Sequence, residues 1–277
     1  MVRELYPQAI GYFDDGGFEN MKSFFILTDL EGPAGVDSFT QTRPGDGYPE
    51  RVDAAKKLLA REVNACIEGI RSVYPNARID VWDGHGPGGL FAEDIVGGTY
   101  LREGHPYKKL EGYDALLFVG QHAMAGTYNA PLNHTYSSRS VAYYRLNGVL
   151  IGEFGARALV AGVQGVPVIF LSGDDKAALE ALLFVPEIET AVVKRGLGIE
   201  AAEHLDGEEA CHAVREGAAE SVRRMAEIPP FTGIAAPYTL EIGYLTAVGQ
   251  SMQGPGVEWI NDRTVRISRD DIRDLPV

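Results

Sequence analysis

Short apolar runs alternate with amphipathic segments through most of the chain. In residues 50–74, apolar side chains recur every three to four positions and share one helical face. Five apolar runs have the length of β-strands: 23–29, 78–82, 115–119, 168–172 and 190–193. Strands that alternate with helices in this way predict an α/β fold built on a mostly parallel, Rossmann-like sheet.

A β-hairpin and two further helices are predicted in the middle of the chain. Residues 147–148 are Asn-Gly, the dipeptide that most favours a two-residue hairpin turn, and strand-like runs at 140–146 and 149–151 flank it. Helices are expected over 153–163 and 174–183, the second of them with an aspartate at its N-cap.

The character of the sequence changes near Gly196. A long polar helix is expected over 208–228, where two prolines end it. Three strands typical of a smaller antiparallel sheet follow at 238–245, 257–260 and 264–267. We therefore predict three parts: a flexible N-terminal extension (1–20), an α/β metal-binding catalytic domain (21–195) and a smaller α+β C-terminal domain (196–277).

Composition argues against several classes of partner. The chain has 25 Lys and Arg against 39 Asp and Glu, a net charge of −14, whereas nucleic-acid-binding proteins present a basic surface. Anionic membrane surfaces repel such a chain, and no apolar run approaches the ~20 residues of a membrane span. Two cysteines, Cys66 and Cys211, are too few for a disulfide framework. No secretory signal is recognisable, so the expected location is the cytoplasm.

Residues that bind metals follow three of the predicted strands. Asp29 ends the first strand and Glu31 comes shortly after it, while His85 and His122 follow the second and third strands. Because the carboxyl ends of parallel strands lie along one edge of a sheet, we expect these side chains to converge there. Glu153, at the start of a predicted helix, can present its carboxylate to the same edge.

A mixed set of carboxylates and imidazoles favours particular metals and a particular number of ions. Nitrogen and oxygen donors together suit zinc, manganese or cobalt better than calcium, which prefers oxygen alone. Five ligands exceed the needs of one tetrahedral catalytic zinc but suit two ions that share a bridging carboxylate. Two such ions about 3.5–4 Å apart can activate a bridging hydroxide toward a carbonyl group, as in several aminopeptidases.

Each candidate also has a structural explanation when it is considered alone. Asp29 can be a turn residue, and Glu153 can be an acid that the helix dipole favours. Histidines at strand ends can be structural residues. His134, in the loop after the third strand, can be either a surface residue or a general acid–base. The convergence of several such residues at one predicted edge is what favours a metal site.

Two other interpretations stay open. Residues 84–89 (GHGPGG) match the GxGxxG pattern of dinucleotide-binding loops and follow a strand. They follow the second strand rather than the first and make a poor helix opening, which argues against a nucleotide-dependent oxidoreductase. The other alternative is a non-enzymatic module that binds a small molecule and holds an incidental metal.

Several short motifs together resemble one family. In chain order they are DLEG (29–32), DGHG (83–86), GQHA (120–123), NHTY (133–136) and GEFG (152–155). They are similar in type, order and approximate spacing to the motifs of the M55 zinc D-aminopeptidases, which GVPVIFLSGDD (165–175) and TAVVK (190–194) match as well. The similarity is clearest over about residues 22–195 and looser beyond them.

This resemblance implies a role for each matching residue. It implies two zinc ions per subunit with five ligands: Asp29, Glu31, His85, His122 and Glu153. Asp29 would bridge the ions, and His134 would be the catalytic histidine. The resemblance also implies hydrolysis of short peptides with an N-terminal D-residue and a ring-shaped homo-decamer. Another amide substrate, such as a peptidoglycan fragment, is the alternative.

Overall fold

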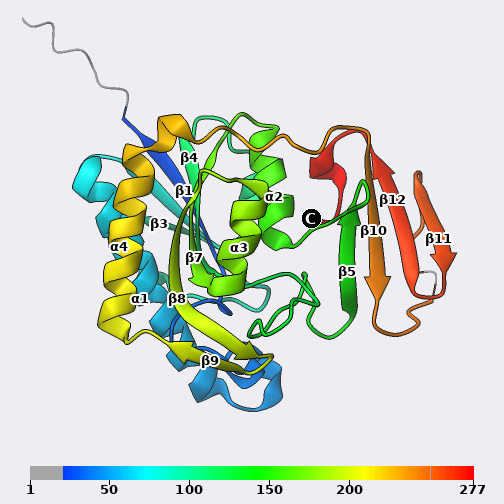
Figure 1. Cartoon of the computed structure of the whole chain (residues 1–277), viewed down its shortest axis with the longest axis horizontal. Coiled ribbons are helices and arrows are strands. Elements are labelled where there is room, and N and C mark those ends of the chain that lie inside the picture. The colour runs from blue at the N-terminus through cyan, green and yellow to red at the C-terminus, as the bar shows by residue number, and fades with distance from the viewer. Residues whose placement is uncertain (1–20, 250) are drawn as a thin grey trace, which may run out of the picture.

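The computed structural model describes residues 21–249 and 251–277 of the chain (Figure 1). The extension predicted at residues 1–20 lies outside the described residues. The described part contains a seven-stranded sheet with helices on both faces and a five-stranded antiparallel sheet beside it (Figure 1). The predicted α/β class with a mostly parallel sheet is therefore confirmed.

The larger sheet has the strand order β3-β2-β1-β4-β7-β8-β9. Neighbouring strands run parallel except β8 and β9, which pair antiparallel. The strands are β1 Ser23–Thr28, β2 Arg78–Asp83, β3 Thr99–Leu101, β4 Ala115–Gln121, β7 Val168–Asp174, β8 Glu189–Gly198 and β9 Ala201–His204. Because β1 lies between β2 and β4, the carboxyl ends of these three strands meet where the strand order reverses, which is the usual ligand position in such sheets.

Helices cover both faces of this sheet and bury its central strands. β1 (SFFILT) and β4 (ALLFVGQ) have only buried residues, which explains their continuous apolar sequences. On one face α1 (Pro49–Val73) packs against α4 (Gly207–Arg223), and on the other α2 (Glu153–Gly162) packs against α3 (Asp175–Phe184) (Figure 1). None of the described helices combines the length and the apolarity needed to cross a membrane.

Local sequence accounts for where two of these helices begin. α1 has Pro49 in its first turn, where the missing N–H group costs no hydrogen bond. Asp174 is the N-cap of α3, and its carboxylate accepts hydrogen bonds from the backbone N–H groups of Lys176 and Ala177. The predicted acidic cap of this helix is therefore confirmed. The proline of α1 removes one N–H group that would have no partner at the helix start, and the aspartate of α3 accepts hydrogen bonds from two of them.

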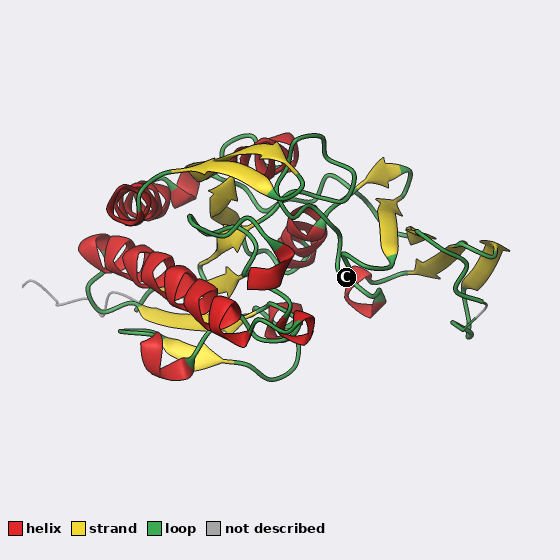
Figure 2. Cartoon of the chain, turned by 90° about the horizontal axis from the view of Figure 1, so that it is seen from below, coloured by secondary structure: helices red, strands yellow, loops and turns green. Residues whose placement is uncertain are grey.

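The smaller sheet has the strand order β11-β12-β10-β5-β6 and is antiparallel throughout. Its strands are β5 Val141–Leu146, β6 Val149–Leu150, β10 Tyr238–Tyr244, β11 Val257–Asn261 and β12 Thr264–Arg269. Asn147 and Gly148 both have positive φ (48° and 88°), so the predicted two-residue turn between β5 and β6 is confirmed. Figure 2 shows this sheet extending from one end of the molecule.

The two sheets do not follow the predicted division at residue 196. The β5–β6 hairpin precedes that residue but pairs with β10, which follows it. Helix α4 also follows it, yet packs on the larger sheet against α1 and β8. These pairings join segments far apart in the sequence, so local pattern does not reveal them. The division into domains at this residue stays a prediction.

Two short strands and the end of a third differ from the sequence-based expectation. β3 and β9 are not predicted because TYL and AAEH are too short to show a period. β8 continues to Gly198, beyond the expected end at residue 193, because antiparallel pairing with β9 extends it. The pairing partner, rather than the strand's own sequence, sets its length.

Candidate metal centre

The five predicted ligands gather at the carboxyl edge of the larger sheet. Asp29 and Glu31 follow β1, His85 follows β2, and His122 comes directly after β4. Glu153 is the first residue of α2 and approaches from the helix. All five residues are buried, with exposed fractions between 1% and 7%. The topology thus places carboxylates and imidazoles from four separate segments in one water-poor site.

The side chains form two groups, within each of which the candidate ligand atoms lie within 4.8 Å of one another. The first group is Asp29, Glu31 and His85, and the second is His122, His134 and Glu153. His122 Nε2 lies 3.3 Å from Asp29 Oδ2, so the two groups are adjacent. The structure therefore brings together every residue that the sequence analysis singled out. Which of them bind metal, and whether His134 is catalytic, stay predictions.

Backbone carbonyl groups orient two of the imidazoles. His122 Nδ1 lies 2.9 Å from the carbonyl oxygen of Ala123. His134 Nδ1 lies 2.9 Å from the carbonyl oxygen of Leu132. Because a carbonyl oxygen only accepts, each Nδ1 donates, and the Nε2 atoms lie 3.6 and 3.8 Å from Glu153 Oε1. Metal-binding histidines are commonly held in this way, with one ring nitrogen on a carbonyl and the other available to the metal.

Three buried atoms of the candidate ligands have no hydrogen-bond partner among the described residues. They are Glu31 Oε2, His85 Nδ1 and His122 Nε2. His122 Nε2 approaches Asp29 and Glu153 without hydrogen-bond geometry. An unpaired buried polar atom is costly, and a carboxylate oxygen and an imidazole nitrogen are both ligands of zinc-like divalent ions. The donor set therefore fits a divalent metal.

The buried carboxylates and imidazoles shift one another's pKa. Burial raises the pKa of Asp29 to about 6, and the neighbouring Glu31 adds to the rise. Burial lowers the pKa of His85, but the Glu31 carboxylate 3.4 Å away outweighs it and raises that pKa to about 9. Asp29 and Glu153 likewise overcome burial and raise the pKa of His122. The imidazoles therefore hold protons that a metal ion must displace.

Glu153 is held by two neighbours to which the sequence alone assigns no role. The backbone N–H of Tyr136 donates to Glu153 Oε1 at 2.8 Å, and Arg157 Nη1 lies 3.1 Å from Glu153 Oε2. Arg157 stands four residues after Glu153 on α2, a spacing that is visible in the sequence. Tyr136 has a φ of 59°, a left-handed conformation that is rare for an aromatic residue. No pattern in the sequence predicts it.

Lys194, on β8, holds the loop that carries Asp29 and Glu31. The lysine is buried, and its ammonium donates to three backbone carbonyl groups of the loop, those of Glu31, Pro33 and Val36. Glu62 of α1 accepts a hydrogen bond from the backbone N–H of Ala34 at 2.8 Å. Lys194 lies in the TAVVK motif, but the motif by itself indicates no role for it. Only the fold shows that it fixes the first ligand loop.

Gly32 permits this loop to pass close beneath β4. Its N–H donates to the carbonyl oxygen of Gly120 at 2.7 Å. A Cβ atom at Gly32 would lie 2.1 Å from the carbonyl carbon of Gly120, so no larger residue fits without a backbone shift. The glycine at the end of the DLEG motif therefore has a packing reason.

The glycine-rich segment 84–89 forms a turn rather than the start of a helix. Asp83 Oδ1 accepts a hydrogen bond from the N–H of Gly89 at 2.8 Å. Asp83 Oδ2 accepts one from the N–H of Leu90 at 3.3 Å and one from the hydroxyl of Tyr100 at 3.1 Å. Asp83 thus organises the loop that carries His85, and this turn explains the glycines without a bound dinucleotide.

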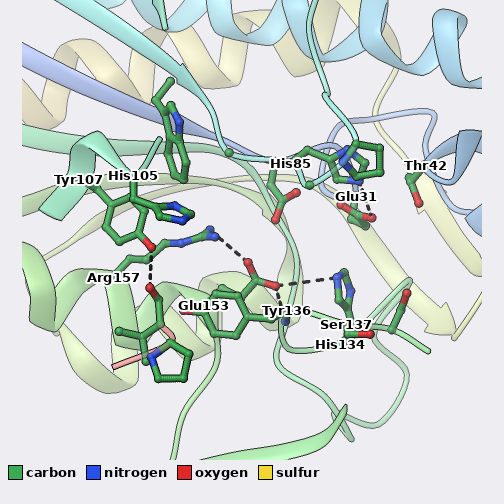
Figure 3. A pocket seen from close by; sticks show the side chains of 18 of the residues that line it. Glu31, Thr42, His85, His105, Tyr107, His134, Tyr136, Ser137, Glu153 and Arg157 are labelled. Atoms are coloured by element: carbon green, nitrogen blue, oxygen red, sulfur yellow. Dashed lines mark hydrogen bonds and ion pairs between the residues drawn. The ribbon is translucent and has the colours of Figure 1, made fainter. Parts of the chain in front are cut away.

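A cavity of about 620 Å³ opens onto the cluster (Figure 3). Glu31, His85, His134 and Glu153 line it, and Figure 3 shows them around the same space as the aromatic rings of Tyr107 and Tyr136. His122 does not line the cavity and is 1% exposed; its ring stacks on that of His134, with the ring centroids 4.1 Å apart. The volume lies within the range of small-molecule sites, which is about 300–1,000 Å³.

Comparison with known proteins points to one family. The sequence model of the D-aminopeptidase family, peptidase family M55, matches residues 21–276. The D-aminopeptidase of Bacillus subtilis (strain 168) is 29% identical over 216 residues, which cover 75% of this chain and 76% of that protein. A solved structure described as the Zn-dependent D-aminopeptidase DppA from Bacillus subtilis, a self-compartmentalizing protease, has a TM-score of 0.81 and 26% identity. That match covers 91% of this chain and 93% of DppA.

We expect metal binding to release protons and to strengthen as pH rises toward 9. The pKa of His85 is raised to about 9, so at pH 7 this imidazole is protonated and must lose its proton to become a ligand. Calorimetric titration of metal-free protein with Zn²⁺ or Co²⁺, in buffers of different ionisation enthalpy, measures the number of protons released. Binding without proton release at pH 7, or with affinity independent of pH between 6 and 9, would contradict this charge distribution.

Proposed function

Because the chain belongs to the M55 family of metal-dependent D-aminopeptidases, we propose that it uses two zinc ions per subunit to hydrolyse short peptides with an N-terminal D-residue. The match to the family model over residues 21–276 confirms the resemblance seen in the short motifs. The observation that carries the proposal is the buried cluster of carboxylates and imidazoles at the carboxyl edge of the larger sheet, in two adjacent groups that can each hold a metal ion.

The proposed ligands of the two zinc ions are Asp29, Glu31, His85, His122 and Glu153. Asp29 is the proposed bridge, because it belongs to one group while its Oδ2 lies 3.3 Å from His122 of the other. Zinc identity is supported by the Zn-dependent DppA, and the count of two is supported by the two groups. Bound here, the ions supply an activated water and polarise the scissile carbonyl.

His134 is the proposed catalytic histidine. Its side chain is 12% exposed and lines the cavity, while His122 is out of reach of a substrate. Burial, reinforced by the nearby His122, lowers the pKa of His134, which keeps the imidazole neutral at pH 7. Its Nδ1 is fixed by the Leu132 carbonyl, so Nε2 is the atom that can exchange a proton with the leaving amine or contact the tetrahedral intermediate.

The decisive experiment measures the zinc content of the protein and compares its cleavage of D- and L-dipeptides. We expect zinc-reconstituted protein to contain about two equivalents of zinc per chain, measured by elemental analysis. It should cleave D-Ala-D-Ala at least about tenfold faster than L-Ala-L-Ala in kcat/KM, because a preformed site positions one stereoisomer for attack. A chelator should abolish both activities. Equal or faster cleavage of the L-peptide would remove the D-selectivity, and a single zinc at full activity would remove the two-metal site.

Substitution of His134 separates catalysis from metal binding. His134→Ala should lower kcat by about 10²–10⁴-fold, the usual range for loss of a general acid–base, while zinc content stays at the wild-type level. His212→Ala, at an exposed position on α4, is the matched control and should change neither quantity. Loss of zinc in proportion to activity would instead make His134 a ligand, a possibility that its place in the second group makes worth measuring.

We further propose that the subunits form a closed homo-oligomer that shelters the active sites, specifically a ring-shaped decamer. The support is the description of DppA as self-compartmentalizing, together with the similarity of the two structures over most of both chains. Ten chains of 30.0 kDa predict a particle of about 300 kDa by light scattering. A stable, fully active monomer would contradict the enclosed arrangement. The cytoplasmic location stays a prediction.

A further inference from the structure

The cavity has an acidic floor and a cationic wall. Its floor is formed by the carboxylates and imidazoles of the candidate metal centre. Five cationic side chains also line it: Arg43, Arg102, Lys108, Arg139 and Arg157. In a chain with a net charge of −14, so many cations around one cavity do not follow from composition. Such a concentration is expected where an anionic group binds.

Four of these cations already have partners in the protein. Arg139 and Arg157 each pair with a carboxylate. Arg102 and Lys108 direct hydrogen bonds to backbone carbonyl groups. Among residues 21–249 and 251–277, neither Arg43 nor Lys108 has a carboxylate within 4.0 Å of its charged group. Lys108 donates to two backbone carbonyl groups, whereas the side-chain hydrogen bond of Arg43 goes to the hydroxyl of Ser138. Arg43 is therefore the cation of this wall that has neither a carboxylate nor a carbonyl oxygen as a partner among the described residues.

The Arg43 guanidinium is nevertheless held in a fixed orientation. It stacks on the ring of Phe39 at 3.6 Å from the centroid, and its Nη2 donates to Ser138 Oγ at 2.7 Å. Phe39 begins a short 3₁₀ helix whose N-cap, Ser38, is bound by Glu200. Within the described part of the chain, the Nη1 group of Arg43 donates to no acceptor. A stacked guanidinium with unused donors is pre-organised for an oxygen ligand.

A second guanidinium and two hydroxyl groups stand beside it. Ser137, Ser138 and Arg139 line the same cavity and follow His134 closely in the loop. Arg43 is hydrogen-bonded to Ser138, and Arg139 is the next residue along this loop, so both arginines line the same part of the cavity. Arg139 pairs with Asp46, so it adds positive charge beside Arg43, while Arg43 supplies the unused donors. A carboxylate bound there can accept hydrogen bonds from the Arg43 guanidinium.

We propose that Arg43, assisted by Arg139, binds the C-terminal carboxylate of the peptide substrate and thereby makes the enzyme selective for short peptides with a free C-terminus. This inference rests on the proposed peptidase function. In a dipeptide the carboxylate lies one residue, about 3.3–3.6 Å of chain, beyond the scissile carbonyl. One cavity can then engage the reacting end of the peptide at the candidate metal centre and the carboxylate at the cationic wall. Amides, esters and long chains lack the carboxylate at that place.

The test compares two substrates that differ only in that carboxylate. For the zinc-loaded wild-type enzyme, kcat/KM should be higher for D-Ala-D-Ala than for D-Ala-D-Ala amide. Arg43→Met should lower kcat/KM for the free acid about 10- to 100-fold, mainly through KM, because a charge-assisted pair is lost. The same variant should cleave the amide within about twofold of wild type, because the amide makes no such pair. Arg43→Lys should recover part of the loss, since it keeps the charge without the planar fork.

Arg223→Met is the matched control, since Arg223 is half exposed on α4 and, among the described residues, forms an ion pair only with Glu220 of its own helix. It should leave both substrates unaffected. Equal loss on the acid and the amide would make Arg43 a structural residue, and no loss on the acid would remove it from the site. Either result overturns the inference, as does a wild-type enzyme that shows no preference for the acid.

A binding measurement separates this inference from the proposed function. The probe is the reduced dipeptide D-Ala-ψ[CH₂NH]-D-Ala, which cannot be hydrolysed, together with its C-terminal amide. Calorimetry should show that Arg43→Met weakens binding of the acid at least about tenfold and leaves the amide unchanged. If wild type binds the acid through Arg43 but cleaves neither dipeptide, the peptidase proposal fails and the carboxylate site stands. Equal affinity for the acid and the amide, unchanged by Arg43→Met, would contradict the proposed carboxylate site.

Discussion

At the carboxyl edge of the larger sheet, three carboxylates and three imidazoles lie together with little access to water. Charges removed from water are costly unless opposite charges compensate them. Here the carboxylates favour protons on two of the imidazoles, which explains the raised pKa of His85 and of His122. A divalent cation offers stronger compensation to the same atoms. The need of these buried carboxylates for compensating positive charge is the constraint on which the surrounding structure depends.

Much of the nearby structure acts to keep these side chains in place. Carbonyl groups of the β4–β5 connection orient the imidazoles of His122 and His134. Arg157 and the strained Tyr136 backbone hold Glu153 from two sides. Lys194 reaches across from β8 to fix the first ligand loop. Because each support comes from a strand or helix or from a loop bound to one, these contacts favour a site that is already formed before a metal binds.

The cavity above the cluster offers different partners to the two ends of a short peptide. A free dipeptide carries an amine at one end and a carboxylate at the other, separated by only a few bonds. The candidate metal centre at the floor can take the reacting end, and the Arg43–Arg139 wall presents positive charge to the carboxylate, within one space of about 620 Å³. Charge complementarity of this kind selects among ligands through the cost of leaving a buried charge unpaired. It offers a chemical limit on substrate length that does not depend on assembly, although an enclosed oligomer would act in the same direction.

The sequence by itself determined the α/β class, the long helix α1, the hairpin at Asn147-Gly148 and the residues that follow the first parallel strands. These depend on local periodicity and on the rule that parallel strands present their carboxyl ends together, so Asp29, His85 and His122 could be placed at one edge without coordinates. The short strands β3 and β9 could not be predicted, because a run of three or four residues shows no periodicity.

Only the tertiary structure decided which segments meet across long separations. It paired the β5–β6 hairpin with β10, returned α4 to the larger sheet, and brought Lys194 under the ligand loop. It also placed Arg43 beside the loop of His134, although nothing in the local sequence of either segment points to the other. Such contacts are set by packing and by the burial of charge over the whole molecule, quantities that no stretch of sequence contains on its own.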